Sequence, residues 1–546
     1  MKIQSLYSKE IMKHFTKPKN VGVIKNADGV GRVGNITCLP TGSKVQTNPF
    51  LCPIETLDVE SKVLSHDGKY NKVSKIFKRD YSGKIINIKS RLGTVRLTPE
   101  HLIKSIKVPK GDKYLRIKNK HSLPPAWYHA IELKRNDILL YPKPKIVKDV
   151  KEIKIDVPKY KYDFRSKKIP TSIAIDGDFL RLAGYFITEG DTNTKMCHVN
   201  LTLSFGSHEK EYIDDASNLF KKIFNLGSII KTNEQQNVTI ITVNNVHVTR
   251  FFNKLFGKGC VNKQIPEFML FLPTKKQKEL IRGLWRGDGF INTKIPRAGF
   301  STVSYKLAQQ VKFLLIRQGI IPSFYIEKEK SIRGTHHKEA YRIHVGSWSV
   351  RNLANLLGRN LCEKELTHDS WVDENYIYLP ITSVTNEFYS GEVHNLEIEN
   401  THSFATDSAL LHNCGDIMEL YIKVKKDKKG NEIISDIKFQ TFGCVVALAV
   451  SSMLTIMVKG KTIEEAIKIT NKDILKKSGP VPPIKIHCSI LAADALKESI
   501  YNYLSKSKKP IPEVLKKEHE RIQSTLKQVE KTHKEFTSFE EKMLKK

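Results

Sequence analysis

The sequence predicts a multidomain protein of mixed α+β class. Its 546 residues exceed what one hydrophobic core usually organises, so we expect three or more structural units. The hydrophobic fraction of 40% and the charged fraction of 27% are typical of chains with packed cores. The spacing of apolar residues also changes along the chain, which separates strand-rich regions from helix-rich ones.

The two ends of the chain predict a small α+β unit. Near the N-terminus SKEIMKHF indicates a helix, followed by a turn-rich stretch to residue 37. After Cys414, MELYIKV and IKFQTF alternate apolar and polar residues as half-buried strands do. CVVALAVSSMLTIMVKG and CSILAADALKESIYNYL then predict helices that begin at a cysteine. This unit extends from 414 to 510, and residues 511–546 predict a charged helical tail.

The interior of the chain predicts two further structures. From 38 to 150, β-type runs such as KVSKIF, GKIINIKS and GTVRLT are spaced as in an all-β module, and similar runs return from 381 to 413. Residues 151–380 mix helices and strands. They carry two similar stretches, RLAGYFITEGD and IRGLWRGDGF, which we expect to form two related helices.

The charge balance favours a polyanion as partner. The formal net charge is +34, and roughly +20 of it falls between residues 38 and 413, which points to nucleic acid. A lysine-rich proteome is the alternative explanation. The N-terminus has no secretory signal, and no run reaches the roughly 18 to 20 apolar residues of a membrane span, so we expect a cytoplasmic protein. The eight cysteines contain no CxxC pair and are expected to be ligands, nucleophiles or core residues.

The ends of segment 38–413 predict that the chain cuts this segment out of itself. The segment starts with Cys38 and ends in His412 and Asn413, directly before Cys414. Joining its flanks gives GRVGNIT-CGDIMELYIKV, a loop that continues into a strand. The Cys38 thiolate would attack the preceding carbonyl, Cys414 would take over the acyl group, and cyclisation of Asn413 would release the segment.

Residues 38–413 resemble an intein with an embedded LAGLIDADG homing endonuclease. CLPTGSKV resembles the N-terminal splicing motif, LTPEH matches the TxxH motif, VHNLEIENTHSF resembles the penultimate motif, and LLHNC the C-terminal one. The resemblance implies an all-β splicing domain of the horseshoe type that needs no cofactor. It gives Thr98 and His101 the role of polarising the first scissile amide, and places His402 at the penultimate histidine. Asn395 stands where the family usually has an aspartate.

The two related helices predict a paired-acid site. Gly283 and Gly287 lie on one helical face, Ala183 and Gly184 serve similarly in the other helix, and small residues let two backbones approach closely. Such packing would bring Glu189 and Asp288 side by side at the helix ends. Paired carboxylates suit divalent metal ions that support phosphodiester cleavage.

The LAGLIDADG resemblance extends this prediction. It implies two pseudo-symmetric αββαββα halves whose sheets straddle the major groove of double-stranded DNA, with Mg²⁺ as cofactor and the host gene without its insert as target. It assigns Glu189 and Asp288 as catalytic acids and Lys263 as an accessory lysine, although Glu189 replaces the commoner aspartate. The alternative is a degenerate endonuclease that survives only as a folded insert.

The rejoined flanks resemble the NifU/IscU-type iron–sulfur cluster assembly scaffold. YSKEIMKHFTKPKNVGVIKNADGVGRVGN matches its opening, while CGDIMELYI, FQTFGC and PPIKIHCSILAADAL carry its three cysteines. Helix N-termini stabilise thiolates, as iron requires. The resemblance implies a 2Fe-2S cluster, iron or zinc on Cys414, Cys444 and Cys488, with Asp416 tuning its lability and His487 as a further ligand. Burial as small hydrophobic residues is the alternative for these cysteines.

The scaffold resemblance also implies partners. They are a cysteine desulfurase, acceptor apoproteins, and a chaperone that recognises residues 482–485. Two other function classes compete with this interpretation: a DNA-binding endonuclease with non-functional flanks, and an autocleaving protein that does not ligate. The flanks complete each other's motif, which argues against the first class. The Asn413-Cys414 pair argues against the second, because cleavage alone needs no second nucleophile.

Overall fold

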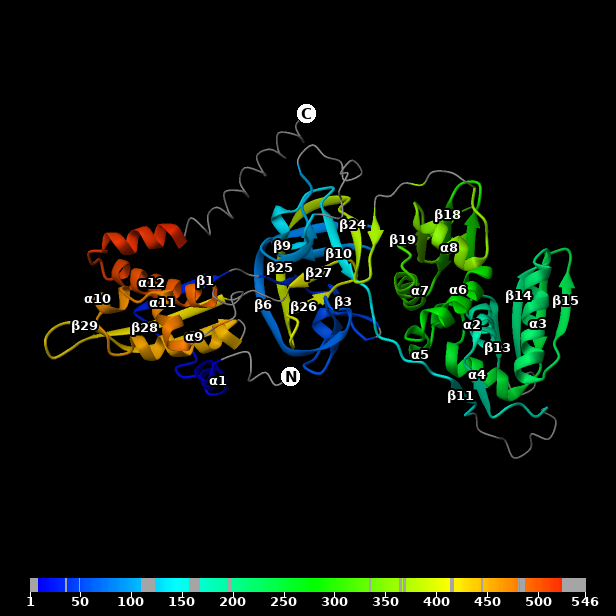
Figure 1. Ribbon diagram of the computed structural model, residues 1–546, viewed down its shortest axis with the longest axis horizontal. Helices are drawn as coiled ribbons and strands as arrows, with labels where there is room; N and C mark the ends of the chain where they lie inside the picture. The colour runs from blue at the N-terminus through cyan, green and yellow to red at the C-terminus, as the bar shows by residue number, and fades with distance from the viewer. Residues whose placement is uncertain are drawn as a thin grey trace. The chain divides into compact units, whose positions relative to one another are not determined.

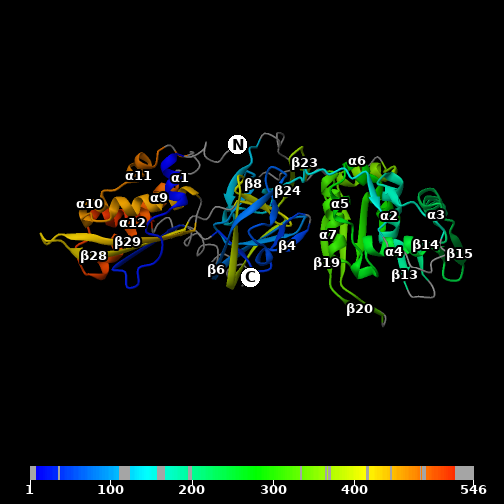
Figure 2. The same cartoon turned by 90° about the horizontal axis from the view of Figure 1, so that it is seen from below.

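The computed structural model of the chain divides into two compact units. Met1–Cys38 and Asn413–Lys546 form the first unit, and Leu39–His412 form the second. Figures 1 and 2 show the elements of each unit in two views. Among the described residues, no helix has both the length and the apolar character needed to cross a membrane. The structure describes residues 8–34, 37–48, 50–109, 123–156, 167–194, 199–332, 335–362, 366, 370–412, 417–442, 445–479, 481 and 487–522.

The first unit is a three-stranded antiparallel sheet with helices packed on it. The strand order is β1-β28-β29, so a strand from before the insert pairs with one from after it. Figure 1 shows the blue N-terminal elements of this unit among its orange C-terminal helices. Its elements are α1 (Lys9–Thr16), β1 (Gly29–Gly34), β28 (Ile417–Lys426), β29 (Glu432–Phe442), α9 (Val445–Val458), α10 (Ile463–Ile467), α11 (Asn471–Ser478) and α12 (His487–Lys506). Residues 513–522 are also helical.

The predicted helices and strands of the flanks are confirmed, with one correction. Gly29–Gly34 lies in the stretch expected to be turn-rich, yet it forms strand β1. The glycines of this strand leave room for a helix and do not form a turn. A Cβ added to Gly29 would lie 2.2 Å from the Ser499 oxygen, and one added to Gly31 would lie 2.1 Å from the Ala495 oxygen. Helix α12 therefore sits directly on the backbone of β1.

The first part of the second unit is built from strands; we call residues 39–150 and 370–412 the β-region. One sheet has the order β2-β25-β6-β5, with β7 also on β6; the other has β23-β24-β10-β8-β27-β26, with β9 also on β8. The strands are β2 (Leu39–Pro40), β3 (Lys44–Gln46), β4 (Leu51–Pro53), β5 (Lys62–Leu64), β6 (Tyr70–Lys89), β7 (Thr94–Leu97), β8 (Leu102–Ile106), β9 (Ala126–His129), β10 (Ile138–Pro142), β23 (Trp371–Val372), β24 (Tyr376–Pro380), β25 (Ser383–Ile398), β26 (Ser403–Ala405) and β27 (Leu410–His412).

The β-region corrects one sequence expectation. KVSKIF and GKIINIKS, expected as separate short strands, belong to the single 20-residue strand β6. The intervening glycine does not break it, because β6 is paired with β25 from Val73 to Lys89 and the Tyr81 side chain covers Gly83.

The second part of this unit, residues 151–362, contains a structural repeat; we call it the repeat region. The order helix, two strands, helix, two strands, helix occurs twice, with the separate hairpin β20–β21 added between β19 and β22 in the second half. The two sheets, β13-β14-β16-β15 and β17-β18-β22-β19, have matching orders. The two predicted αββαββα halves are therefore confirmed. In Figure 1 the halves lie on either side of the α2–α6 pair.

The elements of the repeat region follow in chain order. The first half contains α2 (Gly177–Glu189), β13 (Gly190–Asn193), β14 (Asn200–Gly206), α3 (Lys210–Phe224), β15 (Ile229–Asn233), β16 (Val238–Val243) and α4 (Val246–Phe256). The second half contains α6 (Thr274–Arg286), β17 (Gly289–Asn292), β18 (Arg297–Thr302), α7 (Tyr305–Arg317), β19 (Ser323–Glu327), β22 (Ala340–Val345) and α8 (Ser349–Leu357). Shorter elements are β11 (Glu152–Lys154), β12 (Ser172–Ala174), α5 (Glu267–Leu270), β20 (Lys330–Ile332) and β21 (Thr335–His337).

Helices α2 and α6 cross at glycine. A Cβ added to Gly184 would lie 2.7 Å from the Cα of Gly283, and one added to Gly283 would lie 2.3 Å from the Arg181 oxygen. The two backbones are thus in direct contact, as the small-residue faces predicted. One buried apolar cluster continues from the β-region into the repeat region, so both belong to one core.

This crossing generates a stability prediction. Gly283→Ala should lower the free energy of unfolding by about 1–3 kcal/mol, because the new methyl group meets backbone rather than a mobile side chain. Gly227→Ala is the matched control, since nothing lies within 4 Å of a Cβ at that position. Thermal unfolding of the full chain compares the two. Equal stability of both variants would show that the helices need not touch.

Candidate functional site

The TxxH motif forms a buried turn between two strands. Thr98 and His101 lie between β7 and β8, and both side chains are buried. The His101 N–H donates to the Thr98 oxygen over 3.1 Å, and the His101 oxygen accepts from the Ala130 N–H over 2.9 Å. These backbone bonds fix the turn on both sides.

The C-terminal motif lies in the same sheet as this turn. Strand β27, which ends at His412, lies between β8 and β26, and Leu411 is paired with Ile103. The His412 ring packs edge-on against Trp127, with ring centroids 4.8 Å apart. Sheet pairing therefore brings the strand after the TxxH motif beside the strand that ends the segment. Asn413 and Cys414 lie outside the described residues.

His402 occupies the turn between β25 and β26. Its backbone has a φ of 49°, a left-handed conformation that is uncommon for residues other than glycine and is often found at functional sites. Its Nδ1 lies 3.2 Å from Glu397 Oε1. The next residue, Ser403, is the cross-strand partner of His412.

The structure adds two titratable residues that the sequence analysis did not identify. His66 Nδ1 lies 2.8 Å from Ser403 Oγ, and burial lowers the pKa of His66, which favours its neutral form. Lys104 places its Nζ 5.1 Å from the centre of the Trp127 ring, and burial lowers its pKa. His66 lies far from the other motifs in sequence and in no recognised pattern, so only the fold reveals it.

The N-terminal motif continues into β2. Cys38 is buried, and it precedes the pairing of Leu39 with His394 on β25. His394 Nε2 lies 3.0 Å from Thr41 Oγ1. Asn395, the next residue on β25, is buried and its Oδ1 accepts from the N–H of Leu396 over 2.8 Å.

Glu189 and Asp288 lie at corresponding ends of α2 and α6. Glu189 is the last residue of α2, and Asp288 lies between α6 and β17. Burial and the neighbouring Asp288 and Glu209 raise the pKa of Glu189 to about 8. Burial raises the pKa of Asp288 to about 6, although Lys263 opposes this shift. A Cβ at Gly287 would lie 2.8 Å from Glu189 Oε1, so glycine leaves room for this carboxylate.

Lys263 is brought to the same helix ends. Its side chain is buried, and its Nζ donates to the Phe186 oxygen over 2.8 Å and lies 3.6 Å from the centre of the Phe186 ring. Burial lowers its pKa to about 8, while Asp191 and Asp288 act in the opposite direction. The three predicted endonuclease residues are thus electrostatically coupled.

The two acids fit a divalent cation. Both carboxyl groups have raised pKa values, the half-buried Glu189 in part because of the neighbouring Asp288, so positive charge from a cation would favour their ionised forms. The described residues contain no larger cluster of metal-ligating side chains. Glu189 and Asp288 are therefore the candidate metal ligands of this region.

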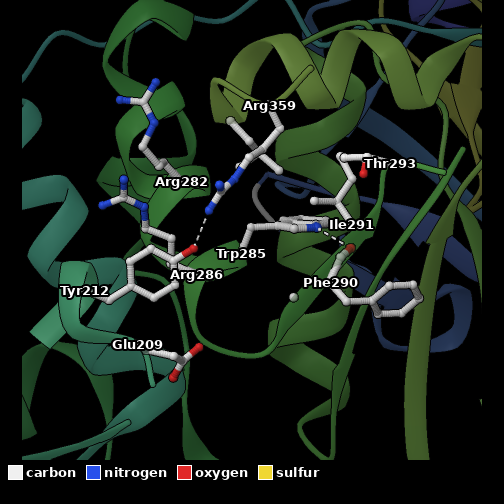
Figure 3. Close-up of a pocket in the computed structure, with 11 residues that line it drawn as sticks. Glu209, Tyr212, Arg282, Trp285, Arg286, Phe290, Ile291, Thr293 and Arg359 are labelled. Carbon is white, nitrogen blue, oxygen red and sulfur yellow. Dashed lines mark hydrogen bonds between the residues drawn. The ribbon is translucent and has the colours of Figure 1, made fainter. Parts of the chain in front are cut away.

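A pocket of about 350 Å³ is lined by three arginines, one glutamate and Gly289, the residue that follows Asp288. Both halves of the repeat contribute to it (Figure 3). Arg359 Nη2 donates to Tyr212 Oη over 2.7 Å, which links the halves across the pocket. Arg286 Nη1 donates to Tyr185 Oη over 2.7 Å and to Asp215 Oδ2 over 3.0 Å. The residues lining it are Glu209, Tyr212, Arg282, Trp285, Arg286, Gly289, Phe290, Ile291, Thr293, Leu357 and Arg359.

The scaffold ligands are described only in part. Cys488 is the second residue of α12 and is buried, which places it at a helix start as expected. Helix α9 begins at Val445, next to Cys444. Cys414, Asp416, Cys444 and the His487 side chain lie outside the described residues.

Two families match different parts of the chain. Residues 6–43 and 388–510 match the NifU-like N terminal domain, and residues 275–358 match the LAGLIDADG-like domain. A NifU-like domain is split around a LAGLIDADG-like domain. The two resemblances predicted for the flanks and for the repeat region are thereby confirmed.

Individual proteins resemble the two parts separately. The iron-sulfur cluster assembly scaffold protein IscU 1 of Archaeoglobus fulgidus is 55% identical over 96 residues, 18% of this chain and 60% of that protein. The ATP-dependent DNA helicase Hel308 of Thermococcus kodakarensis is 25% identical over 452 residues, 74% of this chain and 39% of the helicase. The chain thus spans less than two thirds of either relative. Among solved structures, the homing endonuclease I-DmoI in complex with DNA and Mn is similar to part of this chain. The match covers 34% of this chain and 99% of the I-DmoI chain, with 15% sequence identity and a TM-score of 0.26.

The acid pair generates a pH prediction. Both carboxyl pKa values are raised in the folded chain, so these groups favour the folded state at low pH, and this contribution is lost as pH rises through about 6 and about 8. A divalent cation must displace the bound protons. Mg²⁺ affinity should therefore increase between pH 6 and pH 8, with proton release on binding.

Calorimetric titration in two buffers of different ionisation enthalpy measures this release. Glu189→Gln should remove most of it at pH 7, because Glu189 has the higher pKa. Glu152→Gln is the control, since this exposed carboxylate lies on β11, away from the α2 and α6 ends. Proton release that is equal in both variants would contradict the assignment.

Proposed function

We propose that the chain is a precursor that excises residues 38–413 and joins residues 1–37 to residues 414–546. The products are an iron–sulfur cluster assembly scaffold and a free site-specific DNA endonuclease. The observation that carries this proposal is the pairing of β1 with β28, in which Gly34 is the cross-strand partner of Ile417. The insert therefore leaves and re-enters the scaffold at one place.

The length of the rejoined connection supports excision. Once 38–413 is removed, only residues 35–37 and 414–416 connect β1 to β28. Six residues are an ordinary length for a connection between neighbouring antiparallel strands. The scaffold sheet can therefore exist in the precursor and persist after the insert is gone.

The similarity to the helicase supports the proposal that residues 38–413 are an insert found in unrelated host proteins. The 170 residues outside 38–413 are less than a third of the chain, so an alignment over 74% of it must include much of the insert. A DNA helicase and a NifU-like domain have no common function that would explain this similarity. A transferable insert does explain it.

The splicing chemistry is a series of acyl transfers. The Cys38 thiolate attacks the Thr37 carbonyl and forms a thioester, which releases the Cys38 amine. The Cys414 thiolate takes over the acyl group and forms a branched intermediate. The Asn413 side-chain nitrogen then attacks its own backbone carbonyl, closing a succinimide and freeing the Cys414 amine, and an S-to-N shift restores a peptide bond between Thr37 and Cys414.

The surrounding residues supply proton transfer and orientation. Thr98 and His101, in their closed turn, are assigned to polarise the first scissile amide. His412 is assigned to assist Asn413, and His402, paired with Glu397, to transfer protons at the same junction. These roles require a neutral or readily protonated imidazole near pH 7. The β-region is the splicing domain in this proposal, in an all-β horseshoe arrangement.

The repeat region is the endonuclease. Glu189 and Asp288 would hold Mg²⁺, which when bound supplies an activated water and charge compensation for the leaving oxygen. Lys263 places a titratable ammonium beside the acids, and Arg359, which is bonded to the Tyr212 hydroxyl, adds positive charge for a phosphate backbone. The double-stranded DNA substrate is the host gene that lacks the insert.

The ligated scaffold carries an iron–sulfur cluster as cargo. Cys414, Cys444 and Cys488 are the proposed thiolates, with Asp416 and His487 beside them. Cys488 at the start of α12 has the helix N-terminus to stabilise its thiolate. A cysteine desulfurase would supply sulfur, and acceptor apoproteins would receive the cluster.

Splicing gives the first functional test. Intact mass of the expressed chain should show a ligated protein of 170 residues and an excised segment of 376 residues. Asn413→Ala should give a branched species instead, because succinimide formation is the step that releases the segment. Cys38→Ala should prevent ligation and allow at most cleavage beside Asn413. Normal ligated product from Asn413→Ala would refute the mechanism.

DNA cleavage gives the second test. Glu189→Ala or Asp288→Ala should lower DNA nicking by at least about a hundredfold, since even outer partners of metal ligands often contribute tenfold or more. Splicing should continue at the unmodified rate in both variants. Asp214→Ala, which changes a carboxylate of α3 outside the acid pair, is the control. A folded Glu189→Ala variant that no longer splices would contradict separate sites.

A further inference from the structure

Helix α7 of the repeat region carries two buried cations, Lys312 and Arg317, with exposed fractions of 4% and 6%. Buried charges on a helix are unfavourable unless acceptors surround them. Lys312 reaches acceptors in the β-region, whereas Arg317 reaches acceptors in both regions, among them Ile146 of the β-region and Gln277 of α6. Neither residue belongs to the motifs that define the two activities.

Lys312 joins two turns of the β-region. Its Nζ donates to the Leu92 oxygen over 2.7 Å and to the Asp407 oxygen over 2.8 Å. Leu92 lies in the turn between β6 and β7, and Asp407 lies in the turn between β26 and β27. A second bond secures the first turn, because the N–H of Phe324 on β19 donates to the Arg91 oxygen over 3.2 Å.

The two turns are internally closed and touch each other. In the first, the Ser90 N–H donates to the Gly93 oxygen over 2.9 Å, and in the second Thr406 donates likewise to Ala409 over 2.9 Å. A Cβ on Gly93 would lie 3.1 Å from Asp407 Oδ2, so the turns are in contact. Because each turn is stiff, a displacement at Lys312 passes to the strands that follow.

Those strands lead to the two ends of the splicing reaction. Strand β7 runs directly into Thr98 and the His101 turn, and β27 ends at His412. Each is only a few residues from the turn that Lys312 holds. One side chain of the repeat region thus fixes the starting points of both motif-bearing strands.

Further contacts make this junction rigid. Arg317 Nη1 donates to the Ile146 oxygen over 2.7 Å, and its Nη2 donates to the Leu272 oxygen over 3.0 Å. The Phe271 ring packs edge-on against Tyr70 on one side and Phe313 on the other, with centroid distances of 6.1 and 6.0 Å. These ring contacts belong to the apolar core that the β-region and the repeat region share.

We propose that Lys312 is a positioning residue for protein splicing, through which the endonuclease fold aligns the N-terminal and C-terminal splicing strands. The inference rests on the proposed splicing function. It predicts that the repeat region supports splicing by holding the splicing strands in position, although Glu189 and Asp288 take no part in the splicing reaction. Burial lowers the pKa of Lys312 to about 8, and the nearby Asp407 acts in the opposite direction, so a cation is retained at neutral pH.

The test compares three full-length variants with the wild-type chain. Lys312→Met keeps the apolar stem and removes the charge and its hydrogen bonds. Lys312→Arg restores a cation with donors, and Lys278→Met is the control on the exposed face of α6. Splicing rate, thiol-induced cleavage before Cys38, cleavage after Asn413, and DNA nicking are measured on the same preparations.

We expect Lys312→Met to slow splicing by about ten- to hundredfold, as small displacements of reacting groups do. Both cleavage reactions should slow together, because Lys312 holds both turns. Lys312→Arg should recover most of the rate, nicking should stay within about twofold in all variants, and Lys278→Met should match the wild type. Splicing at the wild-type rate in Lys312→Met would overturn the inference. It would also be overturned if Lys312→Arg spliced as slowly as Lys312→Met while both variants still nicked DNA.

Two further variants complete the test. Lys312→Gln, which keeps a polar side chain and removes the ammonium group, replaces Lys312→Met if that variant does not nick DNA, with the same expected outcomes. Asp407→Asn keeps the backbone oxygen that Lys312 binds and removes the neighbouring negative charge, so a positioning role predicts splicing at close to the wild-type rate. Slow splicing in Asp407→Asn with unchanged nicking would show that charge balance and not positioning is what matters, and would overturn the inference. If the wild-type chain itself gives no ligated product, the proposed function fails, and this inference fails with it. If the wild type splices and Lys312→Met splices at the same rate, only the inference fails.

Discussion

The antiparallel pairing of β1 with β28 is the constraint on which the rest of the structure depends. It joins residues 29–34 to residues 417–422 in one sheet, so everything between them must start and finish at the same edge. The second unit brings its two ends together, since Val45 near its start forms an antiparallel bridge with Thr406 near its end. An insert with distant ends would pull this sheet apart. A NifU-like domain can therefore fold around its insert only if the insert closes on itself.

The sequence was sufficient to predict residues whose chemical type suits a particular function. It was insufficient to predict elements whose structure depends on packing against distant parts of the chain. Glu189 and Asp288 could be predicted because paired carboxylates suit a metal ion, and Lys263 was predicted from the family resemblance. The structure brings the three residues to the same ends of α2 and α6. Strand β1 was missed because Gly29 and Gly31 look like turn residues, whereas their missing side chains admit helix α12. Similarly, KVSKIF and GKIINIKS looked like two strands because nothing local shows that β25 pairs with both.

His66, Lys104 and Lys312 could not be identified from the sequence for a different reason. Each gains its significance from a partner remote in the chain: His66 from Ser403, Lys104 from Trp127, and Lys312 from the oxygens of Leu92 and Asp407. A lysine in a helical pattern is usually a solvent-facing residue, and α7 gives no local sign that Lys312 is buried. Such residues become visible only when the fold supplies their acceptors.

The repeat region contains two kinds of partly buried carboxylate, and the contrast between them bears on function. Asp215 accepts from Arg181 Nε over 2.8 Å and from Arg286 Nη1 over 3.0 Å, so its charge is compensated within the fold. Among the described residues, no ion pair compensates Glu189, whose pKa is raised to about 8. A stabilising role would favour the first arrangement, because an uncompensated buried carboxylate weakens the fold. Cation binding, as proposed above, would compensate the charge of Glu189 beside Asp288 at the ends of α2 and α6, which a role in stability does not explain.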